Sequence, residues 1–306
     1  MLNAFTVDVE DYYQVSAFED QIDRGAWHGY PSRVVANTQR LLDLLDQHAT
    51  RATFFVLGWT AREFPQLVEE IRDRGHELGS HSFWHRLVYR QTPDEFRMDL
   101  RDSIKAIDDA AGVRVTCYRA PSFSITRKSQ WALEILAEEG IEVDSSIYPI
   151  YHDRYGMPDS QPGIHRRETQ SGTIVEFPPA VLQTRLCNIP VSGGGYFRLY
   201  PRRFTAACIK RVNRRRHPFM FYVHPWEVDP AQPRLPSSSR ISTWRHRVNL
   251  HSTYAKLDCV LKRARFGTLS ESIGGHLARH AAPGAATDVQ PSAVRPAPSQ
   301  SPSVVR

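Results

Sequence analysis

Three histidines fall within one stretch of ten residues, and two of them, His81 and His85, are four residues apart. If the backbone forms a helical turn there, residues four apart share one face and the two imidazoles converge on one ion. Imidazole is a ligand for Zn, Co, Ni or Fe, and a metal with open coordination positions activates water. A pair of histidines is equally compatible with an ordinary surface turn, so other stretches must supply the remaining ligands.

Strand-like and helix-like segments alternate along the chain at intervals of about 25–35 residues. Alternating polarity, or a short apolar run, predicts each strand, and apolar residues at helical spacing predict each helix. This alternation indicates stacked β–α units around a parallel sheet, either open or closed into a barrel. We expect strands at 5–9, 53–58, 115–118, 141–144, 218–224 and 266–269, and helices at 32–47, 64–74, 93–111, 126–139, 201–215 and 251–265.

Polar clusters follow four strand ends, three of them in the predicted strands above and the fourth in the segment 77–79 that leads into the histidine stretch. They lie at residues 8–11, 81–85, 119–123 and 144–146. In a parallel sheet the carboxyl ends of the strands share one edge, where ligands bind. The two histidines are therefore expected to meet carboxylates and an arginine at that edge.

Composition limits the class of protein. The 306 residues are 41% hydrophobic, enough for a large core, and no run of about 18 apolar residues predicts a membrane span. The start lacks the features of a signal peptide, and four widely spaced cysteines fit free thiols, so a cytoplasmic protein is expected. The net charge of +6 is modest, and the basic run 210–217 is interpreted as a solvated helix face, without nucleic acid as a partner.

The end of the chain differs in composition from the rest. Residues 276–306 are rich in Ala, Pro and Ser with few large apolar side chains, which predicts a disordered tail. The remaining part, residues 1–275, is expected to form one catalytic domain.

Five short motifs between residues 3 and 270 resemble, in order and spacing, those of the polysaccharide deacetylases, the NodB-homology group or carbohydrate esterase family four. They are Asp8, His81-Ser-Phe-Trp-His85, Arg119-Ala-Pro121, Asp144-Ser-Ser146 and Val223-His224. The Asp-Val-Glu-Asp-Tyr start is similar to a subgroup that occurs with exopolysaccharide export gene clusters. The resemblance implies an α/β fold, an irregular parallel (β/α) barrel.

The resemblance also implies a divalent metal, zinc before Co, Ni or Fe, held by His81, His85 and one carboxylate. The family start usually has two adjacent aspartates, whereas this chain has Asp8-Val9-Glu10-Asp11. Either Glu10 or Asp11 is then the third ligand. Strand alternation places Glu10 on the same face as Asp8 and favours Glu10, whereas Asp11 fits if the strand ends at Val9.

The remaining roles follow from the same resemblance. Asp8 is expected to act as general base, with Arg119 holding it ionised, because a nearby cation lowers the pKa of a carboxyl group. His224 is the expected acid for the leaving amine, and Asp144 is expected to pair with it. The predicted substrate contacts are Ser122, through its backbone N–H, and the rings of Trp84 and Tyr12.

These expectations describe a metal-dependent hydrolase that removes N-acetyl groups from an amino-sugar polysaccharide or a lipid-linked oligosaccharide. Its expected partner is an N-acetylated glycan, with peripheral association to a membrane export complex left open. Two alternatives remain at this point: an amidase for a small molecule on a related barrel, and a non-catalytic glycan-binding component of an export system.

Overall fold

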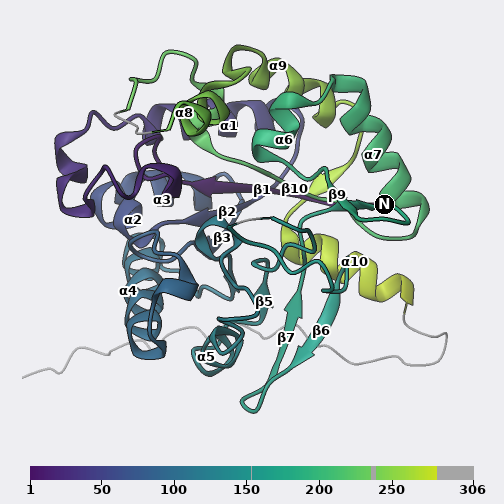
Figure 1. Cartoon of the computed structure of the whole chain (residues 1–306), viewed down its shortest axis with the longest axis horizontal. Helices are drawn as coiled ribbons and strands as arrows, with labels where there is room; N and C mark the ends of the chain where they lie inside the picture. The colour runs from purple at the N-terminus through teal and green to yellow at the C-terminus, as the bar shows by residue number, and fades with distance from the viewer. Residues whose placement is uncertain (153, 236–238, 281–306) are drawn as a thin grey trace, which may run out of the picture.

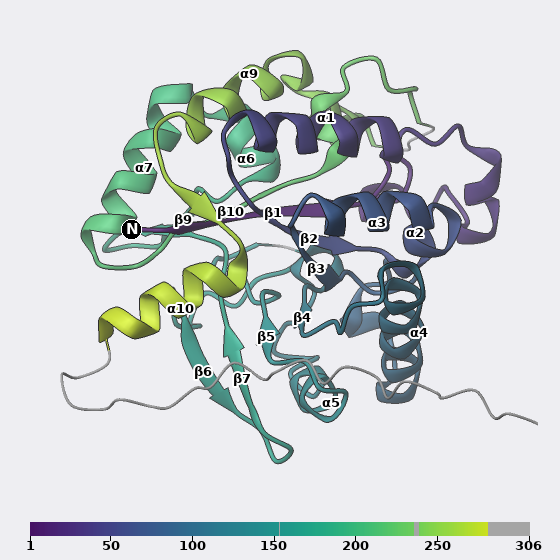
Figure 2. The same ribbon diagram turned by 180° about the vertical axis from the view of Figure 1, so that it is seen from behind.

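The computed structural model describes residues 1–152, 154–235 and 239–280. Its central feature is a curled, mostly parallel sheet in the order β10-β1-β2-β3-β4-β5-β7-β6, with β11 also pairing with β1. Helices cover the sheet, with α1, α7 and α9 above β1 and β10 and with α4 and α5 below (Figures 1 and 2). The α/β class and the barrel-like parallel sheet agree with the sequence prediction.

The elements have the following bounds. The strands are β1 Asn3–Val9, β2 Thr53–Val56, β3 Glu77–Ser80, β4 Cys117–Tyr118, β5 Val143–Asp144, β6 His165–Glu168, β7 Thr173–Glu176, β8 Val181–Gln183, β9 Asn188–Pro190, β10 Met220–Val223 and β11 Phe266–Gly267. The α-helices are α1 Val34–Gln47, α2 Gly58–Glu63, α3 Pro65–Asp73, α4 Pro93–Ala111, α5 Ala132–Glu138, α6 Gly194–Leu199, α7 Arg202–Arg214, α8 Arg240–Arg247, α9 Leu250–Leu261 and α10 Leu269–His280.

Local sequence explains the best-defined helix, α4. Thr92 and Glu95 form a capping box at its start, and Pro93 occupies the first turn, where a missing N–H costs nothing. Gly112 ends the helix in a left-handed conformation with φ 62°. The predicted helix 93–111 is therefore confirmed at both ends.

The parallel pairing brings the carboxyl ends of β1, β2, β3, β4, β5 and β10 to one edge of the sheet. Apolar side chains of the strands pack against the helices in a continuous core, for example Val7, Phe54 and Val223. The polar clusters predicted at the strand ends thus share one edge.

Two predicted boundaries need correction. The disordered tail was expected from residue 276, but α10 continues to His280, because His276 is buried and packs on His217. The rest of the predicted tail, 281–306, lies outside the described residues. The predicted helix 126–139 is shorter, because residues 127–131 form turns before α5 begins at Ala132.

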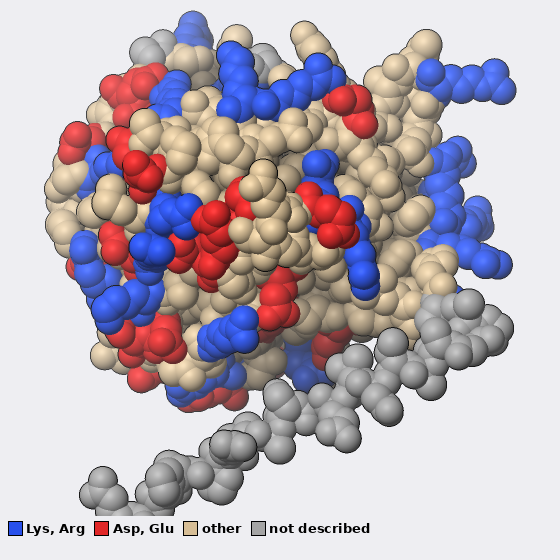
Figure 3. Space-filling view, turned by 90° about the horizontal axis from the view of Figure 1, so that it is seen from below, with Lys and Arg blue, Asp and Glu red and all other residues tan. Residues whose placement is uncertain are grey.

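Charged groups cover the surface without one dominant sign. Acidic and basic side chains are interspersed over most of the face drawn in Figure 3, and basic ones gather at its right edge. The basic run predicted as a helix face forms the end of α7, where Lys210, Arg211 and Arg214 are exposed. No helix among the described residues combines the length and apolar composition that crossing a bilayer requires.

Candidate active site

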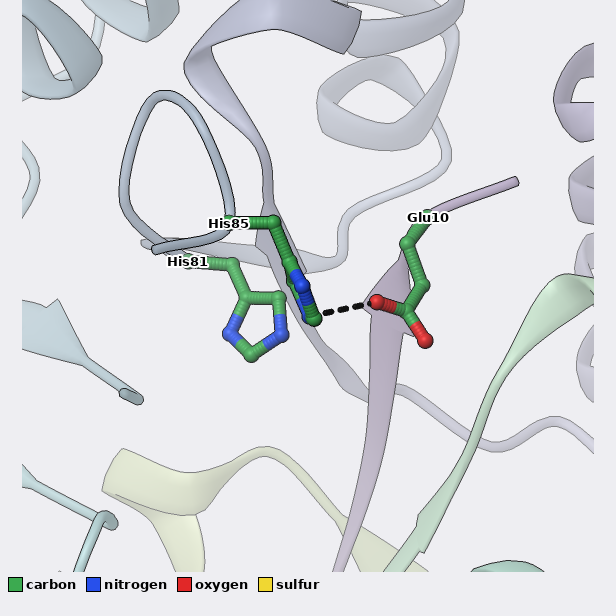
Figure 4. Close-up of side chains that lie close together, drawn as sticks. All are labelled: Glu10, His81 and His85. Carbon is green, nitrogen blue, oxygen red and sulfur yellow. Dashed lines mark ion pairs between the residues drawn. The ribbon is translucent and has the colours of Figure 1, made fainter. Parts of the chain in front are cut away.

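Glu10, His81 and His85 converge at the carboxyl edge of the sheet. Their ligand atoms all lie within 4.8 Å of one another, and all three residues are buried. Glu10 follows β1, whereas both histidines follow β3. Figure 4 shows the three side chains pointing toward a common space, with the Nε2 atom of His85 2.7 Å from Oε2 of Glu10.

The segment that carries the two histidines is a loop and not a helical turn, so the condition considered for their convergence does not hold. Ser82 and His85 instead adopt left-handed conformations, with φ of 67° and 51°. Asp99 of α4 holds the loop by accepting hydrogen bonds from the backbone N–H groups of Phe83 at 2.7 Å and Trp84 at 3.2 Å. Sequence reasoning missed Asp99, because a single acidic residue in an amphipathic helix carries no distinctive signal.

The protonation state of His81 suits a ligand. Its Nδ1 lies 2.8 Å from the backbone oxygen of Arg119, which only accepts hydrogen bonds, so Nδ1 carries the proton and Nε2 has a free lone pair. Burial lowers the pKa of His81 to about 4, so the ring is neutral at pH 7.

Glu10 is ionised although it is buried. Burial alone would raise its pKa, but the nearby rings of His85 and His224 hold that pKa below the usual value. Its Oε2 atom is buried and lies 2.7 Å from Nε2 of His85. A buried carboxylate beside two imidazoles is a donor set that zinc and related ions accept, so these residues fit a divalent metal.

Asp11 points away from this cluster. Its Oδ2 atom accepts hydrogen bonds from Ser32 Oγ at 2.7 Å and from the backbone N–H groups of Arg33 and Val34, which start α1. The carboxylate therefore caps α1 and does not face the histidines. This holds although β1 ends at Val9, the condition under which Asp11 was expected to fit. Of the two alternatives for the third ligand, the structure brings only Glu10 to the site.

Asp8 and Arg119 form a buried ion pair beside the cluster, with Nη1 of Arg119 2.6 Å from Oδ1 of Asp8. The guanidinium is fully buried, donates also to Thr6 Oγ1 and Ser145 Oγ, and lies over the ring of Phe55. Because an arginine stays protonated, the pair places a fixed cation next to the carboxylate of Asp8.

His224 lies at the end of β10, with its Nε2 atom 3.8 Å from Asp8 Oδ2 and 3.6 Å from Glu10 Oε1. Its Nδ1 atom is 2.6 Å from Oε1 of Glu227. Burial alone would lower the pKa of His224, but the carboxylates of Glu10 and Glu227 raise it to about 9. The ring therefore carries a proton at neutral pH.

Arg198 is the partner of Glu227 on the side away from His224. Its Nε atom donates to Oε2 of Glu227 at 2.6 Å, and its two Nη atoms donate to the backbone oxygens of Arg245, His246 and Val248 at the end of α8. Arg198 and Glu227 are both buried. The sequence prediction did not include Arg198, and it assigned the pairing with His224 to Asp144 and not to Glu227.

The predicted pairing of Asp144 with His224 is wrong. Asp144 lies opposite Glu176 in the β5–β7 register and accepts hydrogen bonds from the hydroxyl and backbone N–H of Ser146. Burial raises the pKa of both Asp144 and Glu176, and the proximity of the two groups raises that of Glu176 further. Because Ser146 Oγ also accepts the N–H of Ala120, Asp144 supports the strand end that carries Arg119.

The three predicted substrate contacts have different positions. Tyr12 is fully buried and packs edge-on against Tyr13, so its ring is not available to stack on a sugar, which corrects that prediction. Trp84 is partly exposed beside Trp27. Ser122 is half-buried in a left-handed conformation with φ 52°, and its hydroxyl is hydrogen-bonded to that of Ser16.

Two family models match separate parts of the chain. Residues 21–142 match the model of the polysaccharide deacetylases. This part of the chain is therefore similar to the polysaccharide deacetylases. Residues 145–274 match a second model, described as a domain of unknown function.

Curated relatives share part of the chain. A peptidoglycan-N-acetylglucosamine deacetylase of Bacillus cereus is 28% identical over 120 residues, which are 35% of this chain and 44% of that protein. A peptidoglycan-N-acetylmuramic acid deacetylase of Bacillus subtilis is 29% identical over 124 residues, 39% of this chain and 44% of that protein. The matched segment thus spans less than half of either relative.

The fold has a counterpart among solved structures. A crystal structure from Mycobacterium smegmatis, assigned to the polysaccharide deacetylases, superimposes with a TM-score of 0.56 at 20% identity. It covers 94% of this chain and 93% of the other. At this identity the likeness concerns the fold.

Proposed function

We propose that this chain is a metal-dependent hydrolase that removes N-acetyl groups from an amino-sugar polysaccharide or lipid-linked oligosaccharide. The observation that carries the proposal is the cluster of Glu10, His81 and His85 beside the ion-paired Asp8 and the protonated His224. The similarity to deacetylases of N-acetylated glycans supports the choice of substrate.

The side chains divide the proton transfers of amide hydrolysis between them. A zinc ion, or Co, Ni or Fe, held by Glu10, His81 and His85 would lower the pKa of a water molecule and polarise the acetyl carbonyl. Asp8, paired with Arg119, takes the proton of the attacking water. His224 gives its Nε2 proton to the departing amine, which leaves poorly unless it is protonated.

Glu227 and Arg198 act on His224 without touching substrate. The carboxylate fixes the Nδ1–H of the ring and favours the protonated form, and Arg198 keeps that carboxylate in place. The Nε2–H then points toward Asp8 and Glu10, where the reaction takes place.

The proposal also covers the extent of the domain, the cellular setting and the biosynthetic role of the chain. We propose one catalytic domain spanning residues 1–275. We also propose a reducing, cytoplasmic setting because all four cysteines are free thiols. A role in exopolysaccharide synthesis, with peripheral attachment to an export complex, follows from the sequence resemblance and remains a proposal.

The test is acetate release by the purified protein, supplied with Zn²⁺ or Co²⁺, from N-acetylglucosamine oligomers. The wild-type protein is expected to release acetate, and His81→Ala to lose both bound metal and activity. Full acetate release by a His81→Ala protein that binds no metal would contradict the mechanism. Ring-opened or linear acids from small amides, with intact glycans, would instead identify an amidase.

A further inference from the structure

A hollow of about 590 Å³ opens between two loops at the carboxyl edge of the sheet. One loop follows β4 and contains Arg127 and Lys128, and the other follows β5 and contains Tyr151, Arg154 and Tyr155. Because both loops follow strands of the parallel sheet, this pocket opens on the same edge as the cluster of Glu10, His81 and His85.

Basic side chains surround the pocket. Arg90 pairs with Glu19 at 2.7 Å and Arg127 pairs with Asp159 at 2.7 Å. Lys128 is exposed and has no ion pair with any described residue, and Arg154 donates to a neutral acceptor, the backbone oxygen of Ser16, at 3.1 Å. Among the described residues that line the pocket, basic side chains therefore outnumber acidic ones, which attracts an anion.

Aromatic side chains form the rest of the wall. Tyr151 is 88% exposed at the rim. The ring of Tyr155 stacks on that of His152 with centroids 3.8 Å apart, and its other neighbours include Phe123. Flat rings with a few polar groups are typical linings of ligand pockets, and they suit the apolar face of a sugar.

Packed rings connect this pocket to the proposed acid. Phe123, which contacts Tyr155, packs on Tyr222 at 5.0 Å, and Tyr222 packs on His224 at 5.8 Å. A hydrogen bond between the hydroxyls of Ser16 and Ser122 also links the loop that follows β1 to the loop that follows β4. A series of packed rings thus connects the pocket to His224.

We propose that this pocket binds an anionic group, a carboxylate or a phosphate, on the same glycan chain whose N-acetyl group reaches the metal cluster. The inference rests on the proposed function and narrows the substrate to an acidic or phosphorylated amino-sugar glycan. Tyr151 supplies the platform for a ring, and Lys128 and Arg154 supply the charge.

The experiment measures binding by calorimetry, using the full chain with Zn²⁺ and three probes. They are a neutral N-acetylglucosamine tetramer, a tetramer alternating glucuronic acid with N-acetylglucosamine, and the neutral tetramer with a phosphate at its reducing end. We expect at least one charged probe to bind about fivefold more tightly than the neutral one, the size that one exposed ion pair supports. The preferred probe identifies the source of the charge.

Matched variants locate the effect. Lys128→Glu is expected to abolish the preference, whereas Lys210→Glu, the same charge reversal on α7 at the side where β1 begins (Figure 1), is expected to retain it. The preference should shrink in about 1 M salt, where the screening length is about 3 Å.

Three results would overturn the proposal: no preference for either charged probe, a preference unchanged in Lys128→Glu, or an equal loss in both variants. Acetate release is measured separately on the same probes. Charge-dependent binding without acetate release contradicts the proposed function and supports the anionic pocket. Acetate release without a charge preference supports the proposed function and contradicts the anionic pocket.

Discussion

Replacing Glu227 with glutamine tests the hydrogen bonds that connect His224, Glu227 and Arg198. Both carboxylate oxygens of Glu227 face N–H donors, His224 Nδ1 on one side and Arg198 Nε on the other, at 2.6 Å each. Glutamine has the same shape but only one oxygen, so its amide NH₂ must face one of the two donors. Both His224 and Arg198 then lose a charged partner, and one of them also loses its hydrogen-bond acceptor.

The size of the effect follows from the role of His224. A positioned general acid contributes about 10²- to 10⁴-fold to rate, so we expect Glu227→Gln to lower kcat for acetate release about 100-fold. Breaking a buried ion pair typically costs about 3–5 kcal/mol. We expect a loss near the lower end, about 3 kcal/mol of unfolding free energy, because Arg198 keeps three backbone acceptors at the end of α8.

The matched control is Asp144→Asn, which removes a buried carboxylate that contacts Ser146 and Glu176 and not His224. We expect kcat to fall less than about threefold in this variant. Both proteins are compared by kcat, metal content and thermal melting. A folded Glu227→Gln protein with wild-type kcat, or an equal loss in Asp144→Asn, would refute the assignment of Glu227 as the partner of His224.

Three other outcomes are expected. A chelator should abolish acetate release and added Zn²⁺ should restore it; activity that survives complete metal removal would contradict the role of the cluster. Metal analysis should show that Glu10→Ala loses bound metal and that Asp11→Ala keeps it. Asp11→Ala should instead lose about 1–2 kcal/mol of unfolding free energy, because it removes the cap of α1. Metal loss in Asp11→Ala but not in Glu10→Ala would contradict these two roles. Burial lowers the pKa of His76 from 6.5 to about 4, so between these pH values the unfolded chain binds a proton that the folded chain does not. The free energy of unfolding should therefore fall as the pH drops from about 6.5 to about 4. Urea unfolding of His76→Gln should show a shallower fall over this range, and a pH dependence equal to that of the wild type would contradict this reasoning.

The sequence predicted the architecture because the relevant signals are local and periodic. Alternating polarity marks β1 and apolar spacing marks α1, and parallel pairing then places residues after each strand at a shared edge. The preference for Glu10 over Asp11 came from the same alternation, and the structure brings Glu10 to the histidines.

The partner of His224 was not predictable in the same way. Glu227 lies in a short 3₁₀ turn three residues after the histidine, a pattern with no characteristic period. Asp144 was assigned instead, but it faces Glu176 because β5 pairs with β7, and β7 is a strand whose place in the sheet the sequence did not reveal. Arg198 reaches Glu227 from α6, a contact that depends wholly on tertiary packing.

The division of the site along the chain has a consequence for protein engineering. The two matched family models end and begin at residues 142 and 145, on either side of the two-residue strand β5. Glu10, His81 and His85 precede this boundary, whereas His224 and its supporting residues follow it. A chimaera joined at β5 would therefore exchange His224 and its supporting residues as one unit while the native ligand set is retained. It would have to preserve the pairing of β5 with β4 and β7 and the pairing of β1 with β10.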